Sequence, residues 1–175
     1  MKKLILLGFT IILFAACQQE QRYFDDSAEI ETVKQLYQHI EDGNFEEIRN
    51  IYNDSAKIYR NSDKSVSIDE LIAVDQKGRE GFSMYTFKDS IYPEMVITKK
   101  GEKWVNTWPT WVGKIKGSDK EIVVPAHLTF RFEDGKIVED YGYWDTLPIY
   151  LAMEKAKANS MEEEHEDHDE TDTEE

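Results

Sequence analysis

The chain has few of the residues that build disulfides, metal centres or nucleic-acid-binding surfaces. It contains one cysteine, Cys17, in 175 residues, so an intramolecular disulfide and a cysteine-based metal cluster are both excluded. It carries 21 lysines and arginines against 36 acidic residues, and the resulting net charge of −15 argues against nucleic acid as a partner. The sequence also shows no phosphate-binding loop, no nucleophile–base pair and no set of metal-ligand spacings, so we expect neither a cofactor nor a metal.

Positive charge is missing altogether from the end of the chain. The segment Glu162–Glu175 contains ten acidic residues and no lysine or arginine, and without it the net charge is −5, which is ordinary for a soluble domain. His165 and His168 lie within this run, where they could bind divalent cations loosely, although such charge runs are usually solvated. We interpret 159–175 as an acidic tail, disordered from Met161 onwards and dispensable for folding, because nothing apolar offsets the entropy cost of ordering it.

The chain also has no hydrophobic run long enough to cross a membrane. The apolar run Leu4–Phe14 follows two lysines and is about eleven residues long, whereas a transmembrane helix needs roughly twenty. It ends in two alanines and Cys17, which resembles a bacterial lipoprotein signal. This resemblance implies a signal peptide at 1–17, a lipid on Cys17 that holds the protein at a membrane of the bacterial cell envelope, outside the cytoplasm, and a tether at 18–26. The alternatives are a plain secretory signal or an uncleaved anchor, with the cysteine incidental.

The remaining composition supports one folded domain, which we place at 27–158. Apolar residues make up 40% of the chain and aromatic residues 12%, enough for a real core. Three long antiparallel strands are predicted in a row at Lys103–Lys116, Glu121–Phe132 and Lys136–Trp144. The middle strand is the clearest, because its even-numbered residues from Ile122 to Phe132 are all apolar and form one face of the sheet. The opposite face is mixed, as in an antiparallel sheet with one wetter side.

The hairpin between the second and third of these strands leaves two registers open. A two-residue Asp-Gly loop would pair Phe130 with Glu139. A three-residue loop with a bulge would pair Phe130 with Val138 and turn Asp140 inward. The choice matters for any site, because a slip of one residue exchanges the two faces of a strand.

Helices and short strands are predicted before and after these three strands. The first helix begins near Ser27 with a stripe of apolar residues and ends at Gly43, and Asn44 is expected to cap a second, shorter helix. A capping-box pattern that begins at Ser67 predicts a third helix to about Gly78. The other expected elements are strands at Ala56–Arg60, Phe82–Phe87 and Tyr92–Thr98 and a terminal helix at Thr146–Ala158, and Pro109 is expected to interrupt the first long strand.

Several weak motifs occur in a distinctive order along the chain. They are Gly43-Asn44-Phe45, Asp54-Ser55-Ala56, the run from Phe130 to Ile137 and Tyr143-Trp144-Asp145. Together with the element order, this is similar to the nuclear transport factor 2-like superfamily, within it the SnoaL-like group, over Ser27–Met153. The resemblance implies an α+β fold in which a curved antiparallel sheet packs as a cone against N-terminal helices around an apolar pocket, often in dimers. Members include isomerases, cyclases, epoxide hydrolases, dehydratases and non-enzymatic binding proteins, so the fold does not fix a function.

The resemblance allows two known chemistries to be tested. Aligned at Gly43, the oxyanion tyrosine, the general base and the inward acid of ketosteroid isomerases fall on Leu36, Arg60 and Leu128, and none of these can do the required proton transfer or hydrogen bonding. Limonene epoxide hydrolases need Arg-x-Asp where this chain reads Ala-His-Leu, at residues 126–128. Both activities are therefore argued against.

One acid and two histidines remain as candidates in the folded domain. Asp145 ends the last strand at the expected pocket mouth, where it could act as an acid or base, but capping of the last helix is the stronger interpretation. His127 is expected on the outer face of its strand, opposite the Leu128 face, or at a dimer interface. His39 is expected on the surface of the first helix.

The leading hypothesis is a pocket that binds a small, partly apolar molecule. The pocket residues that we expect are Leu36, Tyr59, Trp108, Leu128, Phe130 and Tyr143, with tyrosine hydroxyls as polar groups. The alternatives are an enzyme of the cyclase, isomerase or dehydratase type that uses Asp145, and a dimeric interaction module without a ligand. A homodimer would form through the outer face of the sheet.

Overall fold

A computed structural model describes residues 21–88 and 90–171, with side chains up to residue 159. The predicted signal peptide, Cys17 and residues 18–20 of the tether lie outside this range, whereas the rest of the predicted tether is described and contains a short strand that pairs with the sheet. The helices are α2 (Ala28–Asp42), α3 (Phe45–Ile51), α4 (Ile68–Arg79) and α5 (Leu147–Thr171). The strands are β1 (Tyr23–Phe24), β2 (Tyr52–Arg60), β3 (Phe82–Lys88), β4 (Glu94–Ile97), β5 (Lys103–Thr107), β6 (Thr110–Ile115), β7 (Glu121–Glu133) and β8 (Lys136–Trp144). In the described ranges, no helix has the length and apolar character needed to span a membrane.

The eight strands form one curved sheet that is organised around β7. β5 and β6 lie end to end along one edge of β7, and β8 pairs with its other edge. Thr107 pairs with Leu128 and Thr110 with Pro125, so the register continues unchanged across the break at Trp108 and Pro109. The predicted strand 103–116 is therefore one strand with an interruption at proline, as expected, because proline has no N–H to donate.

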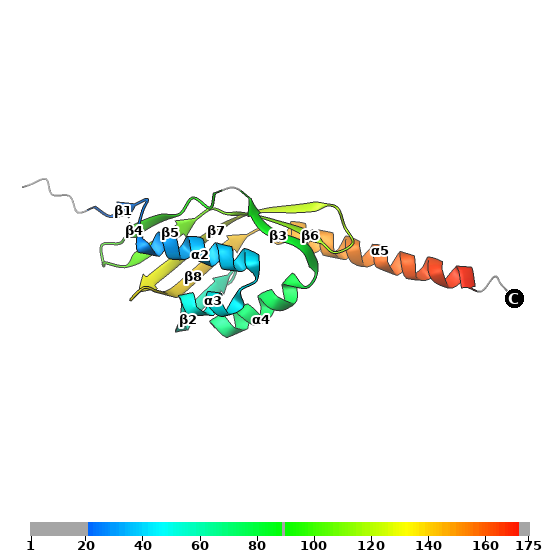
Figure 1. The fold of residues 1–175 in the computed structure, drawn as a ribbon, viewed down its shortest axis with the longest axis horizontal. Coiled ribbons are helices and arrows are strands. Elements are labelled where there is room, and N and C mark those ends of the chain that lie inside the picture. The colour runs from blue at the N-terminus through cyan, green and yellow to red at the C-terminus, as the bar shows by residue number, and fades with distance from the viewer. Residues whose placement is uncertain (1–20, 89, 172–175) are drawn as a thin grey trace, which may run out of the picture.

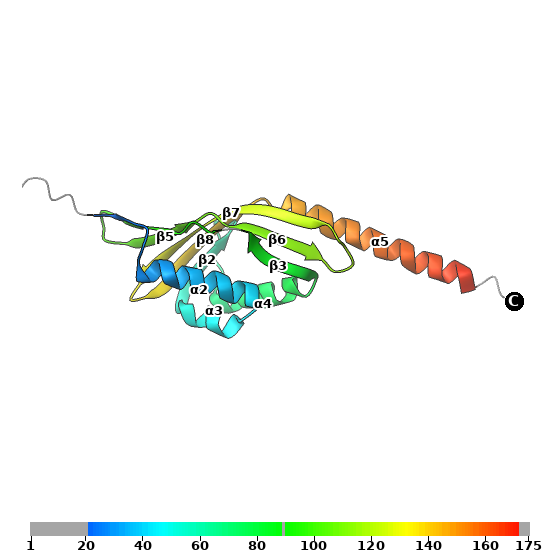
Figure 2. The ribbon, with the colours of Figure 1, turned by 45° about the horizontal axis from the view of Figure 1, so that its top comes forward.

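Helices α2, α3 and α4 cover the concave face of this sheet (Figures 1 and 2). Antiparallel pairing predominates, and β2 adds a parallel pairing with β8. Mixed helices and a curled, mainly antiparallel sheet confirm the predicted α+β fold class.

A bulge decides the register of the β7–β8 hairpin. Glu133 pairs with Lys136 across a two-residue turn in which both residues have positive φ, as the predicted Asp-Gly loop requires. A bulge at Val138 then shifts the register, so Phe130 pairs with Asp140. The two-residue loop is one of the two alternatives that the sequence left open, and neither alternative gave the observed partner of Phe130. Asp140 points inward, which the second alternative had anticipated.

The apolar stripe of α2 forms the solid part of the core. Ile30, Val33 and Leu36 are buried against the sheet together with Val105 and Phe130. Ser27 caps the helix by accepting the N–H of Ile30 at 3.1 Å, and Gly43 ends it in the left-handed conformation. This end of the cone is filled by side chains.

Two of the other predicted helix caps were tested. Ser67 and Glu70 form the expected capping box at the start of α4. Asn44 precedes α3 but makes no side-chain capping bond, so that prediction was wrong.

The last helix continues past its predicted end at Ala158. α5 extends to Thr171 and projects away from the sheet (Figure 1). The structure thus differs from the expectation of a disordered segment from Met161 as far as Thr171, and residues 172–175 lie outside the described range. That the tail is dispensable for folding stays a prediction.

Candidate functional site

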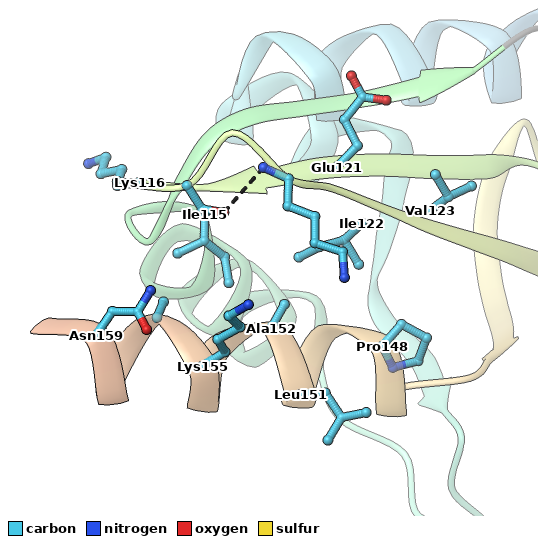
Figure 3. A pocket seen from close by; sticks show the side chains of 14 residues that line it. Ile115, Lys116, Glu121, Ile122, Val123, Pro148, Leu151, Ala152, Lys155 and Asn159 are labelled. Atoms are coloured by element: carbon cyan, nitrogen blue, oxygen red, sulfur yellow. Dashed lines mark hydrogen bonds between the residues drawn. The ribbon is translucent and has the colours of Figure 1, made fainter.

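The described part of the chain contains two hollows near α5. The first is an open groove of about 520 Å³ between α5 and the β6–β7 hairpin. Figure 3 shows Pro148, Ala152 and Lys155 of α5 facing Ile115 and Ile122 of the hairpin across this groove. Three lysines and a glutamate surround it, so it combines a partly apolar floor with a charged, solvated rim.

The second hollow, which we call the inner cavity, lies between the helices and the concave face of the sheet. It has a volume of about 310 Å³, which is at the lower end of the range for small-molecule sites. Six aromatic side chains line it, from α2, β3, β6 and β8: Tyr37, Phe82, Tyr85, Phe87, Trp111 and Trp144. Leu128 and Ala126 of β7 and Ile149 and Met153 of α5 add aliphatic surface, and Arg60, Asp75 and Arg79 are its charged residues.

A buried ion pair forms part of the polar wall of the inner cavity. Arg60 of β2 donates from Nη1 to Oδ1 of Asp140 at 2.8 Å and also bonds the second carboxylate oxygen. Tyr52 donates its hydroxyl to Asp140 at 2.7 Å, and Asp140 is fully buried. The bulge at Val138 makes this pair possible, because it turns Asp140 to the inner face. The pair neutralises both charges, which their burial requires.

Asp75 of α4 is the second acid at the inner cavity. The residue lies at the rim and is exposed as a whole, yet desolvation by the surrounding protein raises the pKa of its carboxyl to about 6. The charge of Arg60 opposes this rise, and the charge of Asp140 adds to it. A carboxyl with such a pKa changes protonation close to neutral pH, which is a property of functional sites more often than of structural ones.

Arg79 of α4 closes another part of the wall. Its guanidinium donates to the carbonyls of Ile40, at 2.7 Å, and Glu41 at the end of α2, and it lies 4.7 Å above the ring of Tyr85. Burial raises the pKa of Tyr85 to about 12, so its hydroxyl stays protonated at neutral pH.

The buried indole of Trp111 contributes an unused donor. Trp111 lines the inner cavity, and its Nε1 has no hydrogen-bond partner among the described residues. A buried donor without a partner costs free energy, so it is available to a ligand acceptor. Gly113 makes room for the ring, since a Cβ there would stand 2.3 Å from the indole.

Of the six predicted pocket residues, Leu128 alone lines the inner cavity. Leu36 and Phe130 are each 1% exposed and belong to the filled core. The prediction was wrong for these two because α2 packs directly on the sheet at their level. The space remains further along the sheet, toward β3, β6 and α5.

The other three predicted pocket residues lie on the outer face of the sheet. Trp108 and Tyr143 both stand next to His127, on the face opposite Leu128, and are about half exposed. Tyr59 stacks on Tyr141 with ring centroids 4.4 Å apart. The prediction was wrong for all three because of register: residues directly opposite each other in a sheet share a face.

The sequence candidates for acid–base chemistry also lie away from the inner cavity. Asp145 is exposed, and its Oδ1 accepts the N–H of Leu147 at 2.9 Å at the start of α5, so the helix-end interpretation holds. His127 lies on the outer face as expected, with Nδ1 3.1 Å from the carbonyl oxygen of Thr107. His39 was expected at the surface, but it is partly buried, and its Nδ1 has no hydrogen-bond partner within the described part of the chain.

Sequence reasoning missed Asp75, Arg60 and Trp111 as site residues. Asp75 lies in a polar stretch of a helix, where nothing local separates a cavity acid from a surface acid. Arg60 was considered only as a position where a catalytic aspartate was absent. The available signal for this wall was Asp140, which one of the two hairpin registers turned inward.

Comparison with solved structures identifies the fold. IdmH from Streptomyces antibioticus, for which polyketide cyclase activity has been suggested, is 19% identical over 71% of this chain and 97% of its own, with a TM-score of 0.56. A protein of a Jannaschia species assigned to the SnoaL-like polyketide cyclases is 20% identical over 77% of this chain and 96% of its own, also with a TM-score of 0.56.

A third similar structure contains a small molecule. It is a ketosteroid isomerase-like protein from Catenulispora acidiphila in complex with trimethylamine, 12% identical over 65% of this chain and 84% of its own, with a TM-score of 0.53. No protein-family model and no curated protein sequence matches the chain. At these identities the likeness shows the fold alone, which is the nuclear transport factor 2-like fold expected from the sequence.

Proposed function

We propose that this protein binds a small, partly apolar molecule in the inner cavity. The observation that carries the proposal is the cavity itself, about 310 Å³ of space inside a cone whose other end is fully packed. Close packing leaves few voids of this size in a purely structural core. The aromatic walls would hold an apolar body, and the charged residues would orient a polar group. Similar folds include proteins assigned as polyketide cyclases and one that holds trimethylamine.

The lysine-rimmed groove of Figure 3 is the competing site, and two tryptophan substitutions separate the two sites. Leu128→Trp fills the inner cavity, whereas Lys155→Trp places the same ring in the groove, toward which the Lys155 side chain points in Figure 3. Titration of the full-length protein with the neutral dye N-phenyl-1-naphthylamine should show fluorescence enhancement that Leu128→Trp abolishes and Lys155→Trp preserves. Ala126→Leu is a milder variant of the same wall if Leu128→Trp does not fold. Loss with Lys155→Trp alone would move the proposal to the groove.

Two earlier alternatives lose support. An enzyme that uses Asp145 lacks a geometric basis, because that carboxyl is exposed and bonds the start of α5. An interaction module without a ligand would have a filled cone, and the inner cavity argues against it.

We further propose that Cys17 carries a lipid that holds the protein at a membrane of the bacterial cell envelope, facing away from the cytoplasm. The support is the sequence pattern alone: a short apolar run followed by two alanines and the cysteine. Cys17→Ser expressed in a bacterial host should release the protein from the membrane fraction. A mutant that stays in the membrane with its leader uncleaved would show that the leader itself is the anchor.

A further inference from the structure

One carboxylate on the wall of the inner cavity has no partner. In the part of the chain that the structure describes, no hydrogen bond or ion pair joins Asp75 to another residue. The two arginines of the same wall are engaged elsewhere, Arg60 with Asp140 and Arg79 with carbonyls at the end of α2. The acceptor oxygens of Asp75 are therefore available to a ligand.

This carboxylate is poorly stabilised by its surroundings. Desolvation raises its pKa to about 6, and the nearby charge of Asp140 adds to the rise. At neutral pH the group is still ionised, and the charge of Arg60 offsets the loss of hydration only in part, because the pKa stays above its ordinary value. A positively charged ligand group would supply that compensation.

The walls around Asp75 suit a cation as well. The faces of aromatic rings attract positive charge, and Tyr85, Trp111 and Trp144 all line the cavity with Asp75. Arg79 already uses the ring of Tyr85 in this way, with its own charge offset by the negative end of α2.

The summed charge of the cavity wall and the net charge of the protein also favour a cationic ligand. The four charged groups at this wall, including the buried Asp140, sum to zero when Asp75 is ionised, so an incoming cation meets no net positive charge. The protein as a whole carries −15, and a field of that sign raises the local concentration of small cations.

We propose that the inner cavity selects a molecule with an ammonium group and an apolar body, the ammonium lying against Asp75 and the body against the aromatic walls. This inference rests on the proposed function, because it names the chemical class of the ligand that the same cavity takes. A neutral ligand that accepts a hydrogen bond from protonated Asp75 is the competing outcome, and the two differ in the sign of their pH dependence.

The test compares two probes of the same shape. Benzyltrimethylammonium and neopentylbenzene differ in one atom, nitrogen or carbon, and in charge, so their affinities isolate the contribution of the cation. Competition against N-phenyl-1-naphthylamine on the full-length protein at pH 7.5 should show the cation binding at least about tenfold more tightly. Equal affinity, or a preference for the neutral probe, overturns the inference.

The pH dependence provides the second readout. The quaternary ammonium does not titrate, and its affinity should rise about tenfold from pH 5 to pH 7.5 as Asp75 ionises. The other titratable and charged groups that face Asp75 are Arg60, Asp140, Arg79, Tyr37 and Tyr85. Arg60 and the two tyrosines keep their protons across this range, and Asp140 is bound to Arg60 in an ion pair. An affinity that is flat or falls with pH contradicts the proposal.

Two variants of α4 assign the effect to one carboxyl. Asp75→Asn should bind the cation about tenfold more weakly at pH 7.5 and lose the pH dependence. Glu80→Gln removes an equal charge from the exposed end of the same helix and should leave both unchanged. If neither probe displaces the dye from a folded protein that binds it, the inference falls while the cavity remains a binding site. If the dye itself does not bind, the proposed function falls first.

Discussion

Arg60 and Asp140 form a buried ion pair across two parallel strands, with Nη1 and Oδ1 2.8 Å apart. Removal of one partner leaves the other charge uncompensated in the protein interior. We expect Asp140→Ala to lower the free energy of unfolding by about 3–5 kcal/mol, measured by urea denaturation at neutral pH. The control is Asp54→Ala, whose carboxylate is 91% exposed beside Arg49 and should contribute less than about 1 kcal/mol. Equal losses for the two variants would contradict the prediction.

The charge of Asp75 should destabilise the folded protein above acidic pH. Its folded pKa of about 6 lies above the ordinary value of 3.8, so the folded state binds more protons between these values. The extra proton binding stabilises the folded state relative to the unfolded state. This stabilisation is fully present below about pH 3.8 and is lost as the pH rises through 6. Asp75→Asn, which is always neutral, should therefore be more stable than the wild type at pH 7.5, by about 1 kcal/mol at most, because the residue is exposed and solvent screens it.

Melting temperatures at pH 4 and pH 7.5 measure this difference. The gain from Asp75→Asn should shrink as the pH falls, while Glu80→Gln should give no pH-dependent gain. A gain that is the same at both pH values would refute the assignment to Asp75.

The sequence predicts the solid part of this fold well because periodicity reports burial. The helical stripe of Ile30, Val33 and Leu36 and the alternation along β7 both faced inward as expected. The site was harder to predict, because it depends on where packing is incomplete. Leu36 and Phe130 satisfy the same apolar pattern as Leu128, yet only Leu128 borders space.

Register explains most of the remaining differences. The sequence alone did not place the bulge at Val138, and that bulge turns Asp140 inward to meet Arg60. His127 had been assigned to the outer face from the sequence. Trp108 and Tyr143 lie beside His127 in the observed register, so they lie on the outer face as well. Asp75 had no local signal, because a cavity acid and a surface acid on a helix have the same sequence neighbours.

Asp145 should stabilise the start of α5 and should not affect ligand binding. Its Oδ1 bonds the N–H of Leu147, and asparagine can make the same bond. Asp145→Ala should lower the free energy of unfolding by about 1 kcal/mol, and Asp145→Asn by much less. Neither should change dye uptake, measured beside the denaturation curves. Loss of uptake in a stably folded Asp145→Asn would restore the acid–base interpretation.

Gly113 should be intolerant of even one added methyl group. A Cβ at this position would lie 2.3 Å from the indole of Trp111, so the ring would have to move into the inner cavity. Gly113→Ala should lower the free energy of unfolding by about 1–3 kcal/mol and reduce dye uptake. Gly81→Ala is the matched control, because its nearest atom would be 3.6 Å away. Unchanged uptake in Gly113→Ala would show that Trp111 does not shape the cavity.

The outer face of the sheet should form a homodimer, which we propose from its exposed aromatic residues. Trp108 is 46% exposed and Tyr143 is 50% exposed, next to the partly buried stack of Tyr59 and Tyr141. Aromatic patches of this kind are typical of interfaces, and two copies related by a twofold axis would cover the same patch on each other. Light scattering should therefore report twice the chain mass.

A charge placed in this patch tests the interface. Trp108→Glu would bury an unpaired carboxylate at the contact and should raise the dissociation constant of the dimer at least about tenfold, equivalent to about 1.4 kcal/mol. Tyr150→Glu adds the same charge to a 58%-exposed aromatic position on α5 and should leave the dimer intact. Because both substitutions are at exposed positions, the monomer should keep its fold and its dye uptake. Dissociation by Tyr150→Glu but not by Trp108→Glu would place the interface on α5, and a wild-type protein of single-chain mass at all concentrations would refute the dimer.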